Sequence, residues 1–345
     1  MLFEWGHEHE HGASLGMKYL VNDAGYITSA ANAGIHAVTP VHTSIAAPAP
    51  TLVAASGGDL DIRLVWDASV ANAPKGFTTA VIQAAQLYVN DFAASNRGVG
   101  VAVININVGY GEIAGSTMAA KALGESESYG YLTNYATVTH ALAPKGYTFS
   151  AANEPTKAQF FVTSAEAKAI GLESPAATAG DGFIGFSTLA GTGYSWNFTS
   201  VVGTSHTGTG KNAFDFESTV WHEISEVMGR IGMQGQIFNK LPTYTPVDLF
   251  DFKSPGQLAL NGNGGYFSLD NGTTSLGRYN NANANGGDIT DWASPTSSTL
   301  LLPKGTQDAF NAFAYPGVNG GVSGSDLAAV AALGYGTRAY ALNLA

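Results

Sequence analysis

Residues 213–230, AFDFESTVWHEISEVMGR, constrain the fold more than any other part of the chain. Val220, Ile224, Val227 and Ile231 follow one another at intervals of three or four, so their side chains share one face of an α-helix. A helix of this kind has to bury its apolar face against another layer of the molecule. This segment is therefore the strongest helix prediction in the sequence.

The remaining periodic segments predict both strands and helices. Alternating or β-branched runs predict strands at 60–70, 98–111 and 181–189. Apolar spacings of three and four predict helices at 77–95, about 129–142, about 164–171 and 325–334, the last with Ser325 as N-cap and Gly334 as its stop. Together they predict an α+β fold, a twisted mixed sheet with packed helices.

Composition divides the chain into three expected regions. Residues 1–58 hold a His/Glu tract followed by an Ala/Pro-rich linker, which should bury little. Residues 59–254 carry the periodic segments and the 213–230 helix. Residues 255–345 are rich in Gly, Asn and Ser, have short apolar runs, and are expected to form a C-terminal subdomain that closes with a short helix.

Charge excludes several classes of partner. Only 12% of residues are charged, the net charge is −11, and Lys and Arg form no cluster, so neither nucleic acid nor an anionic membrane is expected as the main partner.

No apolar run in the sequence approaches the length of about 18 residues that a membrane span needs. The chain has no Cys, which excludes disulfides and thiolate metal sites. The low charge suits a protein exported from a bacterium, although the first residues lack the pattern of a secretory signal.

The candidate chemistry lies on the 213–230 helix, which contains the pattern His-Glu-x-x-Glu. His222 and Glu226 are four apart, so both project from the same side of the helix, as two ligands of one metal ion must. Glu223 follows the histidine directly, where an HExxH helix places its general base. The alternative is structural: Glu226 pairs with Arg230 at i+4, and His222 is a hydrogen-bonded histidine of the core.

A literal HExxH also occurs at His7–His11. Glycines bracket it, no apolar stripe supports a helix there, and a catalytic site needs a rigid element behind it. A tract that binds divalent ions loosely is the favoured interpretation.

Several motifs resemble a family of exported bacterial metalloproteases with a zincin-like fold. The motifs are FESTVWHEISEVMGRI (216–231), INVGYGE (106–112), ALGES (122–126), YTPVDLFDF (244–252), GGYFSLDNGTTSLGRY (264–279), GGDITDWAS (286–294) and SDLAAVAALGY (325–335). They are spread over most of the chain. The resemblance implies a zincin-like fold, a zinc ion, and peptide or protein as substrate.

The resemblance also implies residue roles. His222 and Glu226 would be metal ligands, Glu223 the general base, and Asp248 in YTPVDLF the third ligand. Asp251 is the other nearby carboxylate and is not expected to bind the ion. The alternative for Asp248 is a helix N-cap or turn aspartate.

Other ligands and groups stay open. An upstream histidine, His206 or His140, would take the place of Asp248 if the third ligand precedes the helix. Asp270, Asp288 and Asp291 are candidate ligands for calcium, with turn aspartates as the commoner explanation. Tyr244 is a candidate oxyanion donor, with an ordinary core or surface tyrosine as the commoner explanation. The substrate-binding residues are not predicted.

Two functions follow from these observations. The first is a secreted or cell-surface metallopeptidase, in which Glu223 acts on a metal-activated water and the strand 181–189 is an edge strand that holds an extended peptide. The second is a non-enzymatic extracellular structural or adhesive protein on a degenerate zincin scaffold. Its low charge and Gly/Asn/Ser-rich C-terminal third would suit self-association.

Overall fold

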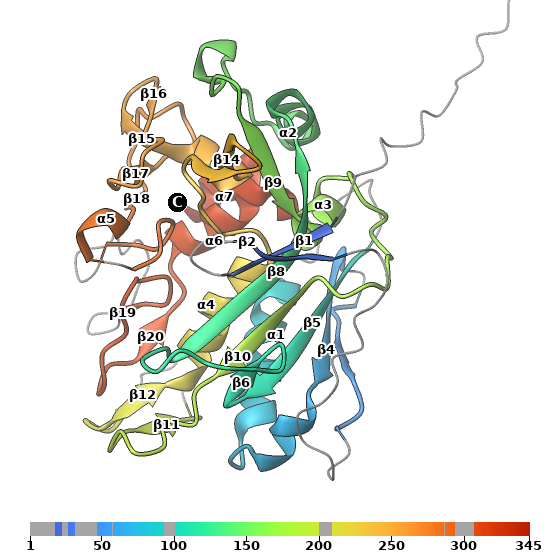
Figure 1. Ribbon diagram of the computed structural model, residues 1–345, viewed down its shortest axis with the longest axis vertical. Coiled ribbons are helices and arrows are strands. Elements are labelled where there is room, and N and C mark those ends of the chain that lie inside the picture. The colour runs from blue at the N-terminus through green and yellow to red at the C-terminus, as the bar shows by residue number, and fades with distance from the viewer. Residues whose placement is uncertain are drawn as a thin grey trace, which may run out of the picture.

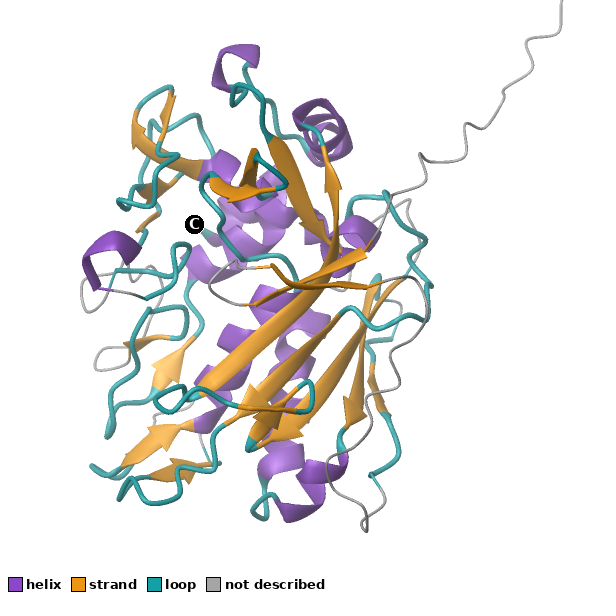
Figure 2. Ribbon diagram, in the orientation of Figure 1, coloured by secondary structure: helices purple, strands orange, loops and turns teal. Residues whose placement is uncertain are grey.

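The computed structural model describes residues 18–22, 27–31, 47–56, 58–92, 101–199, 209–285, 287–293 and 307–345. It has an α+β architecture with a central mixed sheet of ten strands and seven α-helices (Figures 1 and 2). The strands of the sheet are β1 Lys18–Asn22, β2 Ile27–Ala31, β3 Thr51–Val53, β4 Leu60–Trp66, β5 Ala102–Tyr110, β8 Gly124–Thr133, β9 Gln159–Thr163, β10 Gly182–Phe186, β13 Gln236–Phe238 and β14 Leu241–Tyr244. The predicted fold class is confirmed at this level.

The long strand β8 organises the sheet. The strand order is β13-β14-β9-β8-β10-β5-β4-β3, and β1 joins β8 and β2 outside this path. Neighbours β4 and β5, β5 and β10, and β9 and β14 are parallel, whereas β8 is antiparallel to β9, β10 and β1. In Figure 1, β8 crosses the middle of the molecule in green.

Two helices cover one face of the sheet. Helix α1 packs against α4 and β4, and α4 packs against β8 and β10, behind the sheet in Figure 1. The helices are α1 Phe77–Asp91, α2 Tyr135–Leu142, α3 Ser164–Ala169, α4 Phe216–Val227, α5 Ala282–Asn285, α6 Gly324–Val330 and α7 Arg338–Leu344. Among the described residues, no helix is long and apolar enough to cross a membrane.

The remaining described strands are short, and those after residue 250 form a small sheet and a pair in the C-terminal part. A four-stranded sheet has the order β16-β15-β17-β18, and three further pairs are β6–β7, β11–β12 and β19–β20. Their bounds are β6 Glu112–Ile113, β7 Ser116–Thr117, β11 Ser195–Asn197, β12 Ala213–Asp215, β15 Asp251–Ser254, β16 Gln257–Leu258, β17 Tyr266–Phe267, β18 Gly277–Arg278, β19 Gln307–Asp308 and β20 Gly320–Gly321. One large apolar cluster runs from the central sheet through α4 into this part.

Two predicted element boundaries are wrong. The segment predicted as a helix from about 129 belongs to β8 as far as Thr133, and α2 begins only after Asn134. Asn134 Oδ1 accepts a hydrogen bond from the amide of Thr137 and so caps α2. Similarly, the N-cap of α6 is Ser323, whereas Ser325 is buried and donates to the carbonyl of Leu276. Gly334 does leave the helical conformation, with φ of 96°.

Strands on the two sides of each expected domain boundary belong to the same sheet. Strands β1 and β3 precede residue 58, yet both belong to the main sheet, and Val21 and Val53 are buried. The segment expected to bury little therefore contributes to the core. At the second boundary, β15 pairs with β16 across residues 254 and 255, because a tight turn at Gly256 joins them. The His/Glu tract at His7–His11 lies outside the described residues.

Candidate functional site

Helix α4 carries the candidate site and is fixed in the core by its apolar face. Phe216, Val220, Ile224 and Val227 are fully buried. The helix ends before Gly229, whose φ is 119° and where a Cβ atom would lie 2.9 Å from Glu166 Oε2. Only glycine tolerates both that conformation and that contact. The chain therefore turns sharply after the last residue of the His-Glu-x-x-Glu pattern.

His222 faces two carboxylates. Its Nε2 atom lies 3.2 Å from Glu226 Oε1 and 3.3 Å from Asp291 Oδ1. Its Nδ1 atom lies 2.8 Å from the carbonyl oxygen of Ala309, which fixes that nitrogen as the donor. Metal-binding histidines are commonly oriented in this way, because the hydrogen bond at one nitrogen leaves the other aimed at the ion.

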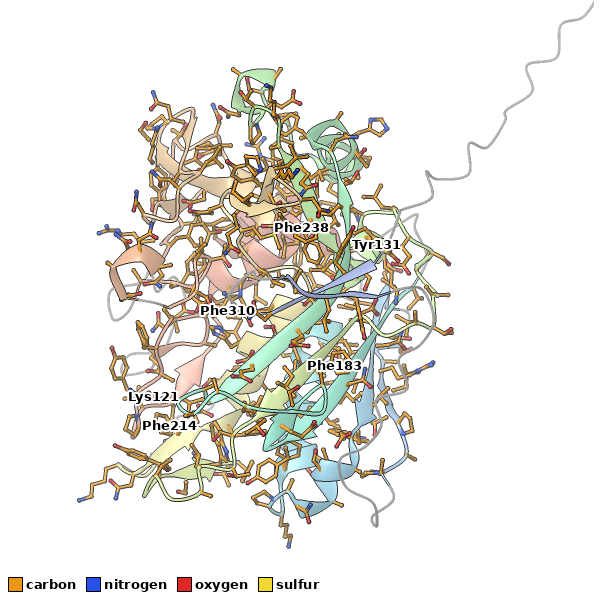
Figure 3. The ribbon with its side chains drawn as sticks, viewed as in Figure 1. Lys121, Tyr131, Phe183, Phe214, Phe238 and Phe310 are labelled. Atoms are coloured by element: carbon orange, nitrogen blue, oxygen red, sulfur yellow. The ribbon has the colours of Figure 1, made fainter. Side chains whose placement is uncertain are left out.

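Arg230 holds the two carboxylates from the other side. Its guanidinium donates to Asp291 Oδ1 at 2.5 Å and to Glu226 Oε1 at 3.3 Å. Its Nε donates to Ser225 Oγ at 2.7 Å, and the charged group lies 4.3 Å from the ring centre of Phe310, labelled in Figure 3. The arginine is completely buried. Its positive charge balances the negative charge of the two buried carboxylates that it contacts.

The charges in this cluster set its protonation. Burial lowers the pKa of His222, but the carboxylates of Asp291 and Glu226 outweigh that effect and hold it well above its ordinary value. For Asp291, burial raises the pKa, whereas the cations His222 and Arg230 lower it to about 2. With no metal, the cluster thus pairs two cations with two carboxylates.

Glu223 lies on the side of α4 that faces the start of β8. It is 5% exposed, and a Cβ atom on Gly124 would come within 2.3 Å of its Oε1 atom, so only glycine leaves room for the carboxylate. Ligand atoms of His222, Glu223 and Glu226 all lie within 4.8 Å of one another. The adjacent Ser126 on β8 donates to Glu226 Oε2 at 2.9 Å.

Two contacts of His222 have nearly the spacing of ligands of one metal ion. Ligands of a tetrahedral zinc ion, each about 2.0–2.2 Å from it, lie about 3.3–3.6 Å from each other. The separations of His222 Nε2 from Glu226 Oε1 and from Asp291 Oδ1, 3.2 and 3.3 Å, are close to this spacing. The geometry is therefore compatible with both interpretations of the helix motif. The Glu226–Arg230 pair of the structural interpretation is present, and His222 also faces the two carboxylates that the metal-site interpretation needs.

Asp248, the expected third ligand, is engaged elsewhere. Its Oδ2 atom accepts hydrogen bonds from the amides of Met233, Gln234 and Thr245, at 3.2, 3.0 and 2.9 Å. It closes a capping box at the 3₁₀ turn Pro246–Phe250, which is the alternative role foreseen for it. Among the described residues, Asp248 joins no group of three potential ligands. Asp291 lies 3.3 Å from His222 and joins a group of three with Glu226 and Asp288.

The other candidates are spread over the molecule. His140 is exposed on α2, and His206 lies outside the described residues. Asp270 Oδ1 accepts hydrogen bonds from Ser268 Oγ and the amide of Thr274, both at 2.8 Å, as a turn aspartate does. Asp288 has a carboxylate oxygen within 4.8 Å of oxygens of Glu226 and Asp291.

Tyr244 and Asp251 belong to the core around the 3₁₀ turn. Tyr244 packs its ring 5.9 Å from that of Phe160. Asp251 is completely buried and accepts a hydrogen bond from Gln234. Asp251 belongs to no group of potential metal ligands in the described part of the chain.

A strand edge that is unpaired among the described residues lies beside the site, but it is not the one predicted. Strand β10 pairs on both sides, with β8 and β5, so the prediction that 181–189 forms an edge is wrong. On β8, β10 pairs with Gly124–Ser128, and β1 pairs on the opposite side with Glu127–Tyr131. No described strand pairs with residues 124–126 on the β1 side. That free edge adjoins Glu223 and Glu226.

Comparison with models of known protein families, with curated proteins and with solved structures finds no match to this chain. The geometry of the site therefore carries the functional argument.

Proposed function

We propose that the protein is a zincin-like metallopeptidase whose divalent ion is held by His222, Glu226 and Asp291. The observation that carries the proposal is the position of His222 Nε2, 3.2 Å from one carboxylate oxygen and 3.3 Å from another. A donor set of one imidazole and two carboxylates suits zinc, with lower affinity than a three-histidine site. The low charge and the sequence resemblance support secretion or a place on the bacterial cell surface as part of the same proposal.

The bound ion would polarise the scissile carbonyl and lower the pKa of water. Glu223 is the residue that takes the proton from the attacking water and delivers it to the leaving amine. Its place supports this role: it belongs to the same group of ligand atoms as His222 and Glu226, and Gly124 leaves space beside it. Ala309 orients His222 through Nδ1, and Arg230 balances the charge of the carboxylates.

The free edge of β8 supports an extended peptide as the substrate. Backbone groups at 124–126 can pair with one more strand, and a strand added there would run past Glu223. A second ion such as calcium at Glu226, Asp288 and Asp291 is less favoured. Glu226 and Asp291 are already the carboxylate ligands of the proposed first ion, so a second ion would have to share both with it.

The second candidate is a non-enzymatic extracellular structural protein on the same scaffold. The observation that favours it is the ion pair of Arg230 with Glu226 and Asp291, which satisfies both carboxylates without a metal. Zinc content and peptide hydrolysis separate the two, because a structural protein needs neither.

Glu223→Gln tests the proposed base. General acid–base residues contribute about 10²–10⁴-fold, so hydrolysis of a fluorogenic peptide library by the zinc-loaded protein should fall by that factor. Zinc content and unfolding midpoint should stay unchanged, because Glu223 is not a ligand.

Glu217→Gln is the matched control on the same helix. Burial, with the nearby Asp215, raises the pKa of Glu217 to about 8, so the glutamine resembles the protonated acid at neutral pH and should leave activity intact. Full activity in Glu223→Gln would contradict the assigned role. A wild-type protein that binds no zinc and cleaves nothing would favour the structural alternative.

A further inference from the structure

A cavity that none of the His-Glu-x-x-Glu residues lines has the features of a small-molecule site. It has a volume of about 170 Å³ and lies between α2, the segment 147–153, the 3₁₀ turn 246–250 and the start of α7. Cavities for drug-sized ligands measure about 300–1,000 Å³, whereas an apolar cavity of about 150 Å³ holds one benzene ring. The size therefore selects a ligand of one ring.

Aromatic side chains form one wall of this cavity. The rings of Tyr147 and Phe149 both pack edge-on against Phe250, with centroid separations of 5.2 and 5.5 Å. Tyr135 and Phe252 also line it. Such a wall favours a flat apolar group, since aromatic rings pair well in edge-to-face geometry.

The polar wall of the cavity carries two buried hydrogen-bond donors that have no acceptor among the described residues. Arg338 and Tyr147 both line the cavity, and the Arg338 Nε and Tyr147 Oη atoms are buried with no hydrogen-bond partner among the described residues. Tyr147 is 2% exposed. No described carboxylate lies within 4.0 Å of the Arg338 guanidinium, although described ion pairs exist elsewhere. A buried donor left unpaired costs about 1–3 kcal/mol, so an acceptor from outside would be favourable.

Asp270 also lines the cavity and determines at which end an anionic group of a ligand would lie. The Oδ1 atom of Asp270 is held by Ser268 Oγ and the amide of Thr274, so this carboxylate is occupied at its own turn. It repels an anion from that side. A ligand anion is therefore favoured at the end formed by Arg338 and Tyr147.

We propose that this cavity binds a small aromatic carboxylate, with the carboxylate on Arg338 and Tyr147 and the ring against Phe250. The charge-assisted hydrogen bonds from an arginine are about twice as strong as neutral ones, and they give the site its preference for an anion. The site is independent of the candidate metal centre.

Binding of 4-fluorobenzoate and 4-fluorobenzamide, followed by ¹⁹F NMR titration of the full chain, tests the proposal. The two probes share shape and ring and differ in charge, so the benzoate should bind at least about tenfold more tightly. Arg338→Met should abolish this preference, and Tyr147→Phe should weaken benzoate binding about 3–10-fold. Arg338→Lys keeps the charge and should retain part of the preference, which keeps the test valid if Arg338→Met misfolds.

Two controls separate this site from the rest of the molecule. Arg278→Met removes an exposed arginine of the C-terminal sheet and should leave benzoate binding unchanged. His222→Ala should also leave it unchanged, so failure of the metallopeptidase proposal does not affect this one. Equal binding of benzoate and benzamide, binding of neither at millimolar concentration, or wild-type binding by Arg338→Met would each overturn the proposal.

Discussion

Two of the groups of buried carboxylates in the described core differ in whether a cation lies beside them. Glu226 and Asp291 share Arg230 and His222, whereas Asp248 and Asp251 have only hydrogen-bond donors and no cation within 4.0 Å in the described part of the chain. We call the first set the compensated cluster and the pair Asp248–Asp251 the acidic pair.

The compensation decides which carboxylates are ionised. In the compensated cluster the pKa of Asp291 is lowered to about 2. In the acidic pair, burial raises the pKa of Asp248 to about 6, and burial together with the charge of Asp248 raises that of Asp251 to about 8. Because a metal ligand has to be deprotonated, Asp291 is ready to bind a cation and Asp251 is not.

Removal of Arg230 should have the largest effect on this contrast. Arg230→Met leaves Glu226 and Asp291 buried with His222 as their one cation, and breaking a buried pair typically costs about 3–5 kcal/mol. The free energy of unfolding in urea, measured with no metal present, should fall by that amount. Addition of zinc should restore part of the loss, because the ion replaces the missing positive charge.

The control for this variant is Arg278→Met, at an exposed arginine, which should change stability by less than about 0.5 kcal/mol. A loss in Arg230→Met no greater than that of the control would mean that the carboxylates need no compensation.

The second prediction compares one carboxylate from each group as a zinc ligand. Asp291→Asn should lower the affinity of the metal-free protein for zinc by at least about 100-fold, since even partners outside the ligand set contribute 10–100-fold. Asp248→Asn should leave the affinity nearly unchanged, because its carboxylate binds backbone amides of the 3₁₀ turn. Calorimetric titration measures both.

The reverse order of affinities would restore Asp248 as the ligand. Such a result would require Asp248 to give up its hydrogen bonds to the amides of Met233, Gln234 and Thr245.

The contrast also explains how far the sequence could predict the site. His222, Glu223 and Glu226 lie on one regular helix, where a spacing of four fixes which side chains share a face. Asp291, Ala309 and Phe310 come from short irregular segments that reach α4 only through long-range packing. GGDITDW signalled oxygen ligands, but no local pattern links it to His222.

The fold shows the same division between local and long-range information. Strands β4, β5 and β10 and helices α1, α3 and α4 follow local periodicity, and each was predicted near its observed position. The interior place of β10 depends on β8, whose last residues, from about 129, were predicted as the start of a helix. Register between distant strands has no signature within one segment.

The smallest expected effect concerns the acidic pair and its pH dependence. Asp251 has its pKa raised to about 8 in the folded protein, against 3.8 when unperturbed. Between these values the folded state keeps a proton that the unfolded state has lost, so its contribution to stability is complete below about pH 4 and is lost as pH rises through 8.

Asp251→Asn carries no titrating group at this position. Its unfolding free energy should match the wild type near pH 4 and exceed it near pH 9. Asp270→Asn is the control of opposite sign: burial is the largest single cause and raises the pKa of Asp270, but the hydrogen bonds from Thr274 and Ser268 together lower it overall, so this variant should be weakly less stable than wild type at high pH. Urea titrations at both pH values measure the difference, and parallel curves for Asp251→Asn and wild type would mean that Asp251 stays ionised in the core.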